Sequence, residues 1–507
     1  MSGVPDRTFV LWAVVTLTAV GVALRFVGLD QQSYHHDEVI TAMRVLPGSF
    51  SQMLEMVKSS ESNPPLYYVL GWGWAKAFGT DEFGLRSLSA LIGALTVPFG
   101  YAIGRELAGR RAGLLLTAML AVNPMLIWYS QEARSYALLV LLGTLSLLFF
   151  LRALRTRSGR DLGLWALTSA LALCSHYFAF FAVGIEAVWL LVALRGRWKL
   201  VLPALAAVGA AGAALLPLIS AQVNPTHISW IEGSPLATRF WEAGSSFLIG
   251  ETGHVIAEPP RDHYALVPVL LVGMALLLVL LRGSARQRRG AATALALGLG
   301  VVVLTAIAAL AGRDYIVERN LLPALVPLAA AAAAGFAAAG ARRLGLLLAV
   351  CLCAYWLAFD VHVTRTPNLQ RPDFRTLAEE IGPPHARRAI VSWKLAADSL
   401  LFYLPDGALR MYGGQEQVEE VYVVSKPLVA AKPVNLPPSF HSAQRLRLDR
   451  LTLTRYVSRD PVRLWFRMLK DLPTGFGDDA VVIDGPRSSR SGLGARARTK
   501  PSLELAP

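Results

Sequence analysis

Long apolar runs separated by short polar gaps fill the first 360 residues of the chain. A helix needs about 20 apolar residues to cross a hydrocarbon layer, and most of the runs approach that length. The runs predict spans at 9–29, 84–104, 112–129, 136–152, 162–176, 177–194, 200–219, 264–281, 291–311, 320–340 and 344–360. The stretch 162–194 gives two spans only if it is split at Ser175-His176. The pattern predicts a mainly α, polytopic membrane protein with about 11 transmembrane helices.

Basic residues collect in alternate gaps between these spans. The gaps contain Arg105, Arg110 and Arg111; Arg152, Arg155, Arg157 and Arg160; Arg195, Arg197 and Lys199; Arg282, Arg286, Arg288 and Arg289; and Arg342 and Arg343. Because cytoplasmic loops carry an excess of Lys and Arg, we expect these gaps to be cytoplasmic. The loops 30–83 and 221–263, and the chain after about Asp360, are then extracytoplasmic.

The first outer loop has structure of its own. Ile40–Leu46 and Phe50–Val57 carry apolar residues at helical spacing, which predicts two short amphipathic helices on the membrane surface. The double proline in Asn63-Pro64-Pro65 predicts an extended bend after them.

The composition changes at Asp373 to that of a soluble domain. Helices are predicted at Phe374–Ile381 and Ala396–Tyr403, and strands at Ala389–Trp393, Val421–Val424 and Ala480–Ile483. We therefore expect a transmembrane domain at 1–360, a small extracytoplasmic α/β domain at 361–486, and a disordered basic tail at 487–507.

Bulk properties exclude several classes of protein. The chain is 54% hydrophobic and 17% charged, unlike a soluble protein of this length. The net charge of +14 lies in topology-setting gaps and the C-terminal tail, so it does not indicate a nucleic-acid partner. Cys174, Cys351 and Cys353 all lie in apolar runs and predict neither a disulfide nor a metal set. There is no phosphate-binding loop, nucleophile elbow or zinc spacing.

Tyr34-His35-His36-Asp37-Glu38 stands just beyond the first predicted span. A carboxylate beside histidines at a membrane edge can act as general base to an incoming hydroxyl, or can hold a divalent cation such as Mg²⁺ or Mn²⁺. The alternative is a solvated pair of acids at a helix N-terminus, where acids are common. The residues alone leave both interpretations open.

Further polar groups are predicted at the outer ends of other spans. Arg86 and Arg319 oppose the positive-inside bias, which indicates a local partner such as a phosphate, or a salt bridge of Arg319 with Glu318 or Asp314. The turn Gln131-Glu132-Ala133-Arg134 is either an interfacial anchor or an Arg–Glu pair facing the outer side. His176 is either a structural histidine or a site residue.

In order and spacing, motifs over roughly residues 1–360 resemble those of the GT-C superfamily of membrane glycosyltransferases. The likeness is to glycosyltransferase family 39, with its protein O-mannosyltransferases and bacterial lipid A aminoarabinose transferases. The motifs are Asp37-Glu38, Pro64-Pro65-Leu66, Arg86-Ser87-Leu88-Ser89-Ala90-Leu91, Gln131–Arg134 and Arg319–Pro323. The sequence departs from family members at Ser62-Asn63, where relatives have His or Glu-Lys, and at Tyr136, where Asp is frequent.

The resemblance implies transfer of a mannose-like sugar from a polyprenyl-phosphate donor to a glycan, lipid or protein hydroxyl, with inversion. It implies a bacterial-type inner membrane with the site outside. Asp37 is expected as base, with Glu38 and His36 orienting it or binding the metal. Arg86, Arg134 and Arg319 are expected to bind the donor phosphate, and Asn63, Tyr67, Tyr68, Glu132 and His176 to bind substrate.

Two other classes of function fit the sequence less well. A lipid or glycan transporter should carry ionisable groups at the bilayer midplane and show repeated halves. Here the ionisable groups gather at the outer ends of the spans, with Glu186 as the main exception, and no repeat is visible. A scaffold would leave the outer acids and arginines without a role.

Overall fold

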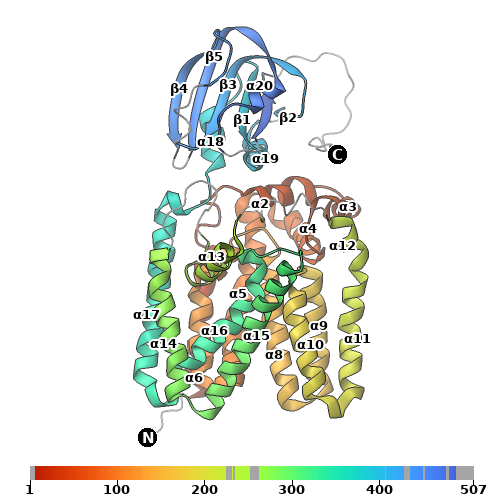
Figure 1. Ribbon diagram of the computed structural model, residues 1–507, viewed down its shortest axis with the longest axis vertical. Helices are drawn as coiled ribbons and strands as arrows, with labels where there is room; N and C mark the ends of the chain where they lie inside the picture. The colour runs from red at the N-terminus through yellow and green to blue at the C-terminus, as the bar shows by residue number, and fades with distance from the viewer. Residues whose placement is uncertain are drawn as a thin grey trace. The chain divides into compact units, whose positions relative to one another are not determined.

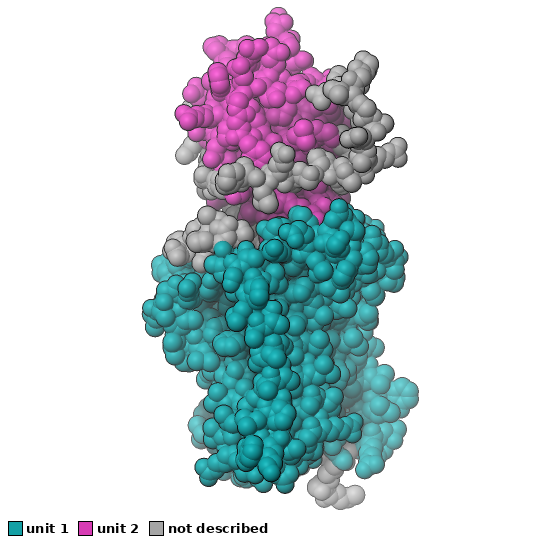
Figure 2. Space-filling model, turned by 90° about the vertical axis from the view of Figure 1, so that its right-hand side faces the viewer, with its two compact units in different colours: residues 1–29, 45–251, 260–365 teal, residues 30–44, 252–259, 366–507 magenta. Residues whose placement is uncertain are grey.

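The computed structural model describes residues 6–223, 231, 234–251, 262–405, 407–427, 434–448, 451–475 and 479–486 (Figure 1). The chain forms two compact units (Figure 2). Unit 1 comprises residues 1–29, 45–251 and 260–365, and unit 2 comprises residues 30–44, 252–259 and 366–507. This division differs from the predicted ranges, because residues 30–44 of the first outer loop belong with the C-terminal part of the chain. The predicted tail at 487–507 lies outside the described residues.

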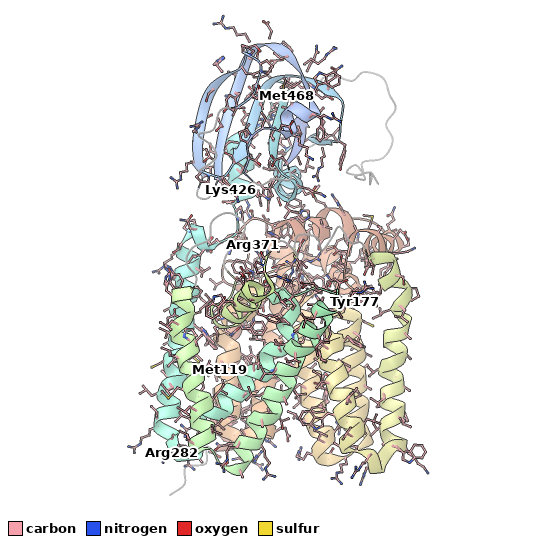
Figure 3. The ribbon with its side chains drawn as sticks, in the orientation of Figure 1. Met119, Tyr177, Arg282, Arg371, Lys426 and Met468 are labelled. Atoms are coloured by element: carbon pink, nitrogen blue, oxygen red, sulfur yellow. The ribbon has the colours of Figure 1, made fainter. Side chains whose placement is uncertain are left out.

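Unit 1 is a bundle of helices. They are α1 (Arg7–Phe26), α3 (Phe50–Ser60), α4 (Leu66–Phe78), α5 (Glu82–Ala108), α6 (Arg110–Val122), α7 (Pro124–Ser130), α8 (Tyr136–Thr156), α9 (Gly159–Ser175), α10 (Ala179–Ala193), α11 (Trp198–Ala214), α12 (Leu216–Gln222), α13 (Leu236–Ile249), α14 (Asp262–Arg282), α15 (Ala285–Leu310), α16 (Leu322–Phe336) and α17 (Arg342–Arg365), with short η2 (Arg195–Arg197), η5 (Glu318–Leu321) and η6 (Ala339–Ala341). Figure 3 shows Tyr177 and Arg282 near opposite ends of this unit, with Met119 between them.

Each of the predicted spans overlaps a helix, but not every helix is long enough to span a membrane alone. Among the described residues, eight helices are sufficiently long and apolar, or nine if the bent pair α6 and α7 counts as one span. The predicted spans 162–176 and 177–194 correspond to α9 and α10, which have 17 and 15 residues. The count of 11 is therefore not confirmed.

The bend between α6 and α7 is stabilised by a buried arginine from α1. The two helices meet at 52° before Pro124, whose ring nitrogen cannot donate to the carbonyl of Leu120. Arg25 supplies the missing donors, with Nη2 2.9 Å from the Leu120 carbonyl and Nη1 3.0 Å from that of Ala121. Its Nε also donates to the Ser130 hydroxyl at 3.2 Å. The polar side chain therefore joins three helices within the bundle.

Helices α5 and α6 approach each other closely at glycines. A Cβ added to Gly104 would lie 2.6 Å from the carbonyl oxygen of Ala112, and one added to Gly113 would lie 2.6 Å from that of Tyr101. These backbone contacts leave no room for a side chain. The glycines thus permit the packing of the two helices, as small residues do in membrane bundles.

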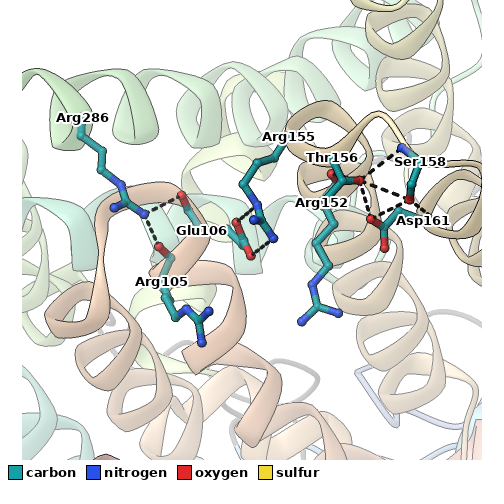
Figure 4. Close-up of polar contacts among 8 residues, drawn as sticks. All are labelled: Arg105, Glu106, Arg152, Arg155, Thr156, Ser158, Asp161 and Arg286. Atoms are coloured by element: carbon teal, nitrogen blue, oxygen red, sulfur yellow. Dashed lines mark hydrogen bonds and ion pairs between the residues drawn. The ribbon is translucent and has the colours of Figure 1, made fainter. Parts of the chain in front are cut away.

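Basic gaps that are distant in the sequence meet at one end of unit 1 (Figure 4). Arg155 at the end of α8 pairs with Glu106 of α5 at 2.9 Å. Arg286 of α15 donates to the backbone carbonyl of Arg105 at 2.6 Å. Gaps that the positive-inside rule assigns to one side of the membrane therefore do share an end of the bundle.

Unit 2 contains a six-stranded sheet of order β2-β6-β1-β3-β5-β4. Its elements are α2 (His36–Ile40), η1 (Thr41–Val45, whose last residue belongs to unit 1), η7 (Pro367–Leu369), α18 (Phe374–Ile381), β1 (Arg388–Trp393), α19 (Lys394–Tyr403), β2 (Leu409–Met411), β3 (Gln415–Ser425), β4 (His441–Leu448), β5 (Leu451–Trp465), α20 (Phe466–Lys470) and β6 (Asp479–Asp484). Strands β1 and β3 are parallel, and the other pairs are antiparallel. The predicted α/β character is confirmed, with β2, β4, β5 and α20 added to the predicted elements.

An apolar core fixes α18 and α19 to the sheet, and a buried arginine of the sheet also binds the end of α18. Leu377 of α18 and Leu400 of α19 pack in one core cluster with Ile390 of β1. Arg388 pairs with Asp484 at 2.6 Å, and both side chains are 1% exposed. Its guanidinium also donates to the carbonyls of Ile381 and Gly382 at the end of α18. A buried pair of this kind is retained where further hydrogen bonds satisfy it.

The first outer loop contains more helix than predicted. The expected helix at Ile40–Leu46 is the short α2 followed by the π-helical η1, and that at Phe50–Val57 is α3. The extended segment predicted at the double proline is short, because α4 begins at Leu66, directly after Pro65.

Candidate active site

The acidic segment, which we define as residues 30–44, contains the predicted base and lies wholly in unit 2. Asp37 and Glu38 occupy the first turn of α2, where Glu38 accepts a hydrogen bond from the backbone N–H of His35 at 3.1 Å. Glu38 is fully buried and pairs with Nη1 of Arg371 at 3.1 Å. The Glu38 carboxylate therefore stabilises the start of α2 through His35 and Arg371, whereas the Asp37 side chain beside it is half-buried.

The predicted orienting residue His36 faces a carboxylate of the C-terminal part of the chain. Its Nδ1 lies 3.3 Å from Oδ2 of Asp398, on α19. The same carboxylate contacts Arg44 at 3.5 Å and Arg410 of β2 at 3.1 Å. Asp398 was not among the predicted site residues, because nothing near it in the sequence marks it as a partner of His36.

His35 completes the polar surroundings of Asp37. Burial lowers the pKa of His35 to about 4, an effect that the nearby Asp37 opposes and Arg371 reinforces. The imidazole is therefore neutral near pH 7. His35 therefore places no positive charge beside the Asp37 carboxylate.

The predicted metal role of Asp37 and Glu38 gains no support from the side chains around them. In the parts of the chain that the structure describes, no group of three or more His, Cys, Asp or Glu side chains is arranged to hold a metal ion. Glu38 is in addition engaged by Arg371. A divalent cation therefore stays a prediction.

Unit 1 holds a second group of predicted site residues around Arg134. Nη1 of Arg134 lies 3.0 Å and 2.8 Å from the two carboxylate oxygens of Glu61, and both residues are buried. Tyr68 donates its hydroxyl to Glu61 at 2.6 Å, and burial raises its pKa well above the usual value. The sequence suggested Glu132 as the acid beside Arg134 and did not indicate Glu61, which stands two positions before Asn63.

Tyr67 and Asn63 belong to the same outer region of unit 1. The hydroxyl of Tyr67 lies 2.8 Å from that of Ser89 on α5. The backbone carbonyl of Asn63 accepts a hydrogen bond from Gln222 of α12 at 3.1 Å. These contacts position the loop before α4, but they do not test whether either residue binds substrate.

His176 lies at the turn between α9 and α10, with 3% of its surface exposed. Its ring centroid is 5.7 Å from that of Tyr136, and its Nδ1 accepts a hydrogen bond from the backbone N–H of Phe178 at 3.2 Å. Burial, followed by the charges of Arg134 and Arg319, lowers its pKa to about 3. His176 is therefore a neutral group close to two of the predicted phosphate-binding arginines.

The other predicted site residues of unit 1 are buried or half-buried. Arg86 is 2% exposed and donates to the backbone carbonyl of Leu29 at 2.7 Å, while Arg319 of η5 is half-buried. Glu132 is buried. Asp314, suggested by the sequence as a partner of Arg319, instead holds Arg239 through two hydrogen bonds of 2.6 Å and 2.5 Å.

The Glu186 carboxylate, which lies within the predicted span 177–194, accepts hydrogen bonds from two neighbouring helices. The indole of Trp165 donates to it at 2.8 Å, and the hydroxyl of Ser146 donates at 2.5 Å. Such satisfied contacts are typical of a structural polar group between helices.

Comparison with known proteins identifies the fold. Residues 62–220 match the family model described as dolichyl-phosphate-mannose-protein mannosyltransferase. No curated protein was found to match the chain. ArnT from Cupriavidus metallidurans in the apo state has 16% sequence identity and a TM-score of 0.55, over 87% of this chain and 97% of that chain. The same protein bound to undecaprenyl phosphate has 14% identity and a TM-score of 0.52 over the same shares.

The Saccharomyces cerevisiae protein O-mannosyltransferase complex Pmt1-Pmt2 is matched over only 44% of this chain and 33% of that chain, with 20% identity and a TM-score of 0.34. That likeness is too weak to extend the fold comparison. The predicted fold class, a helical membrane unit with a small C-terminal sheet domain, is confirmed by the likeness to ArnT. The likeness to ArnT therefore shows the fold of the chain, and the family model matches residues 62–220 of its helical unit.

Proposed function

We propose that the protein transfers a mannose-like sugar from a polyprenyl-phosphate donor to an acceptor hydroxyl at the outer face of a bacterial-type inner membrane, with inversion at the sugar carbon. The observation that carries the proposal is the first turn of α2, where Asp37 stands half-buried beside a Glu38 that Arg371 holds. The family match and the undecaprenyl phosphate bound by ArnT support the donor class.

Asp37 acts as the base in this proposal. The acceptor oxygen attacks the sugar carbon on the face opposite the phosphate, and Asp37 takes the hydroxyl proton as the new bond forms. Glu38 remains paired with Arg371 and keeps α2 in place. In this proposal Asp37 accepts the proton, and Glu38 stabilises the helix on which Asp37 lies.

The leaving group is the lipid phosphate, which gains negative charge as the bond to the sugar breaks. Arg86, Arg134 and Arg319 are the proposed cations for that charge. Glu61 holds Arg134 through two carboxylate oxygens, so it fixes the direction of the guanidinium. His176, neutral beside Arg134 and Arg319, adds no positive charge and is proposed with Asn63, Tyr67, Tyr68 and Glu132 to contact substrate.

The orientation follows from the charge pattern. The basic gaps that meet at one end of unit 1 would lie in the cytoplasm by the positive-inside rule. The connections at the other ends of the spans, and the chain after Arg365, would then be extracytoplasmic. A lipid donor can reach such a site sideways from the bilayer.

Transfer of labelled mannose from polyprenyl-phosphate mannose, in membranes containing the wild-type protein, tests this proposal. Asp37→Asn should lower transfer by at least about 100-fold, since general base catalysis contributes about 10²–10⁴-fold. Asp30→Asn is the matched control, because Asp30 lies in the same acidic segment with an exposed side chain. Addition of EDTA to the same assay tests the predicted divalent cation.

Equal transfer by wild type and a normally inserted Asp37→Asn variant would remove Asp37 as the base. Absence of transfer by the wild type, with polyprenyl-phosphate mannose and with other polyprenyl-phosphate sugars, would refute the donor class.

A further inference from the structure

The acidic segment is bound to the C-terminal domain, which we define as residues 366–486, through several contacts within unit 2. The backbone N–H of Tyr34 donates to the hydroxyl of Tyr403 on α19 at 2.7 Å. The Ser33 hydroxyl donates to the carbonyl of Pro372 at 3.0 Å and accepts from the N–H of Phe374 at 2.9 Å. The domain therefore contacts the start of the segment directly.

Asp398 extends this attachment across the residue proposed as the base. Its carboxylate, 7% exposed, contacts His36 immediately before Asp37 and Arg44 at the end of the segment. Arg410 of β2 contacts the same carboxylate from within the C-terminal domain. One buried carboxylate thus lies 3.3 Å from Nδ1 of His36 and 3.5 Å from the guanidinium of Arg44, and Arg410 joins it to the sheet.

The short length of α2 gives this contact its importance. A helix of five residues has little stability of its own, because helix nucleation is unfavourable and few hydrogen bonds follow it. The direction of Asp37 must then be set by tertiary contacts on either side. Removal of the Asp398 charge would leave the guanidinium groups of Arg44 and Arg410 without this counter-charge, which is unfavourable.

We propose that Asp398 is a positioning residue for the transfer reaction, through which the C-terminal domain orients Asp37 by holding His36 and Arg44. The inference rests on the proposed role of Asp37 as base. It gives the C-terminal domain a part in catalysis, since a domain far away in the sequence supplies a side chain on which the reacting carboxylate depends.

Loss of the Asp398 charge should therefore lower kcat and leave the KM for the lipid donor nearly unchanged. Misplacement of a reacting group by about 1 Å costs about 100-fold in rate, so Asp398→Asn should reduce kcat by about 10- to 100-fold. Asp398→Glu keeps the charge and should fall between wild type and Asp398→Asn. Asp471→Asn, an exposed aspartate of the same domain, is the matched control and should have wild-type kinetics.

The experiment measures kcat and KM with polyprenyl-phosphate mannose for these variants, and for the double variant Asp37→Asn/Asp398→Asn. If Asp398 acts through Asp37, the double variant should be no slower than Asp37→Asn alone. Hydrogen exchange of residues 30–44 in the full-length protein gives a readout that needs no activity. Exchange there should be faster in Asp398→Asn and unchanged in Asp471→Asn.

Wild-type kcat in a folded Asp398→Asn variant would overturn the inference, as would multiplied losses in the double variant or unchanged exchange of residues 30–44. If Asp398→Asn does not fold, Arg44→Gln removes the other partner of the same contact and should give the same selective loss of kcat. Failure of the wild type to use any lipid donor would count against the proposed function alone, because the exchange measurement still reports on the attachment.

Discussion

Buried histidines in both units are kept neutral by their surroundings. Burial is the main cause for His35 and for His176, and nearby arginines add to it in both cases. Each lies beside residues assigned to the site, so protonation in mild acid would introduce a positive charge into a region that already contains arginines. The stability of the protein should therefore depend on pH through these groups.

Replacement of His176 by Gln should make the protein less sensitive to acid. The pKa of His176 is about 3 in the folded protein and about 6.5 when unfolded, so the unfolded chain binds more protons between these values. The contribution of the neutral His176 to the free energy of unfolding is complete above pH 6.5 and is lost as the pH falls toward 3. At pH 5 the loss amounts to about 2 kcal/mol, which His176→Gln should remove.

Thermal unfolding of the detergent-solubilised protein at pH 7.5 and pH 5 measures this difference. The fall in Tm between the two pH values should be smaller for His176→Gln than for the wild type. His385→Gln, which changes an exposed histidine, is the control and should show the wild-type fall. Equal falls in all three proteins would contradict the neutral state of His176.

Single residues of the candidate site could be predicted when the residues next to them marked them. Asp37, Glu38 and Arg134 stand in motifs, whereas Glu61 and Asp398 are defined by partners elsewhere in the chain. Glu61 meets Arg134 from 73 positions away. A sequence pattern records neighbours along the chain, so it cannot show which distant charges neutralise one another after folding.

At the scale of elements, apolar length predicted the helices of unit 1 well, because the membrane demands long apolar segments. Strands were harder to predict. Strand β5 contains Arg459-Asp460-Pro461, which interrupts its pattern, and the pairing of β3 with β5 shifts register near this point. Bulges and prolines in long strands have this effect, so only the short apolar centres of β1, β3 and β6 could be predicted.

Gly104→Ala should weaken the packing of α5 against α6. The added methyl would lie 2.6 Å from the carbonyl oxygen of Ala112, and overpacking of this kind costs about 1–3 kcal/mol. Gly143→Ala on α8 is the matched control, because no atom lies within 4 Å of its added Cβ. It should be neutral or stabilising by up to about 1 kcal/mol, since Ala favours helix over Gly. The Tm of each purified variant checks both expectations, and an unchanged Tm for Gly104→Ala would show that the helices can separate without loss.

At the scale of the whole molecule, the sequence indicated a membrane part and a soluble part but not their boundary. The structure assigns residues 30–44 to the unit that contains the C-terminal sheet, although more than 300 residues separate them in sequence from Thr366. Contacts such as those of Ser33 with Pro372 create that assignment. Composition could not show it, because the segment is an ordinary polar loop when considered alone.

The orientation of the chain can be tested with single cysteines in a variant in which Cys174, Cys351 and Cys353 are replaced by Ala. Ser442→Cys, on the exposed strand β4, should react with a membrane-impermeant maleimide on intact cells. Gly196→Cys, in the basic gap of η2, should react only after permeabilisation. The reverse pattern would place the C-terminal domain in the cytoplasm and would contradict the proposed orientation.

The buried arginine of α1 has a consequence for how the protein is made. α1 leaves the ribosome long before the carbonyls of Leu120 and Ala121, which lie 95 and 96 positions after Arg25. Until α6 and α7 have been synthesised, the guanidinium must be solvated by water or by lipid headgroups, because an unpaired charge in hydrocarbon is strongly unfavourable. Helix α1 therefore reaches its final packing only after α6 and α7 have been inserted. The order of assembly in the membrane then differs from the order of synthesis.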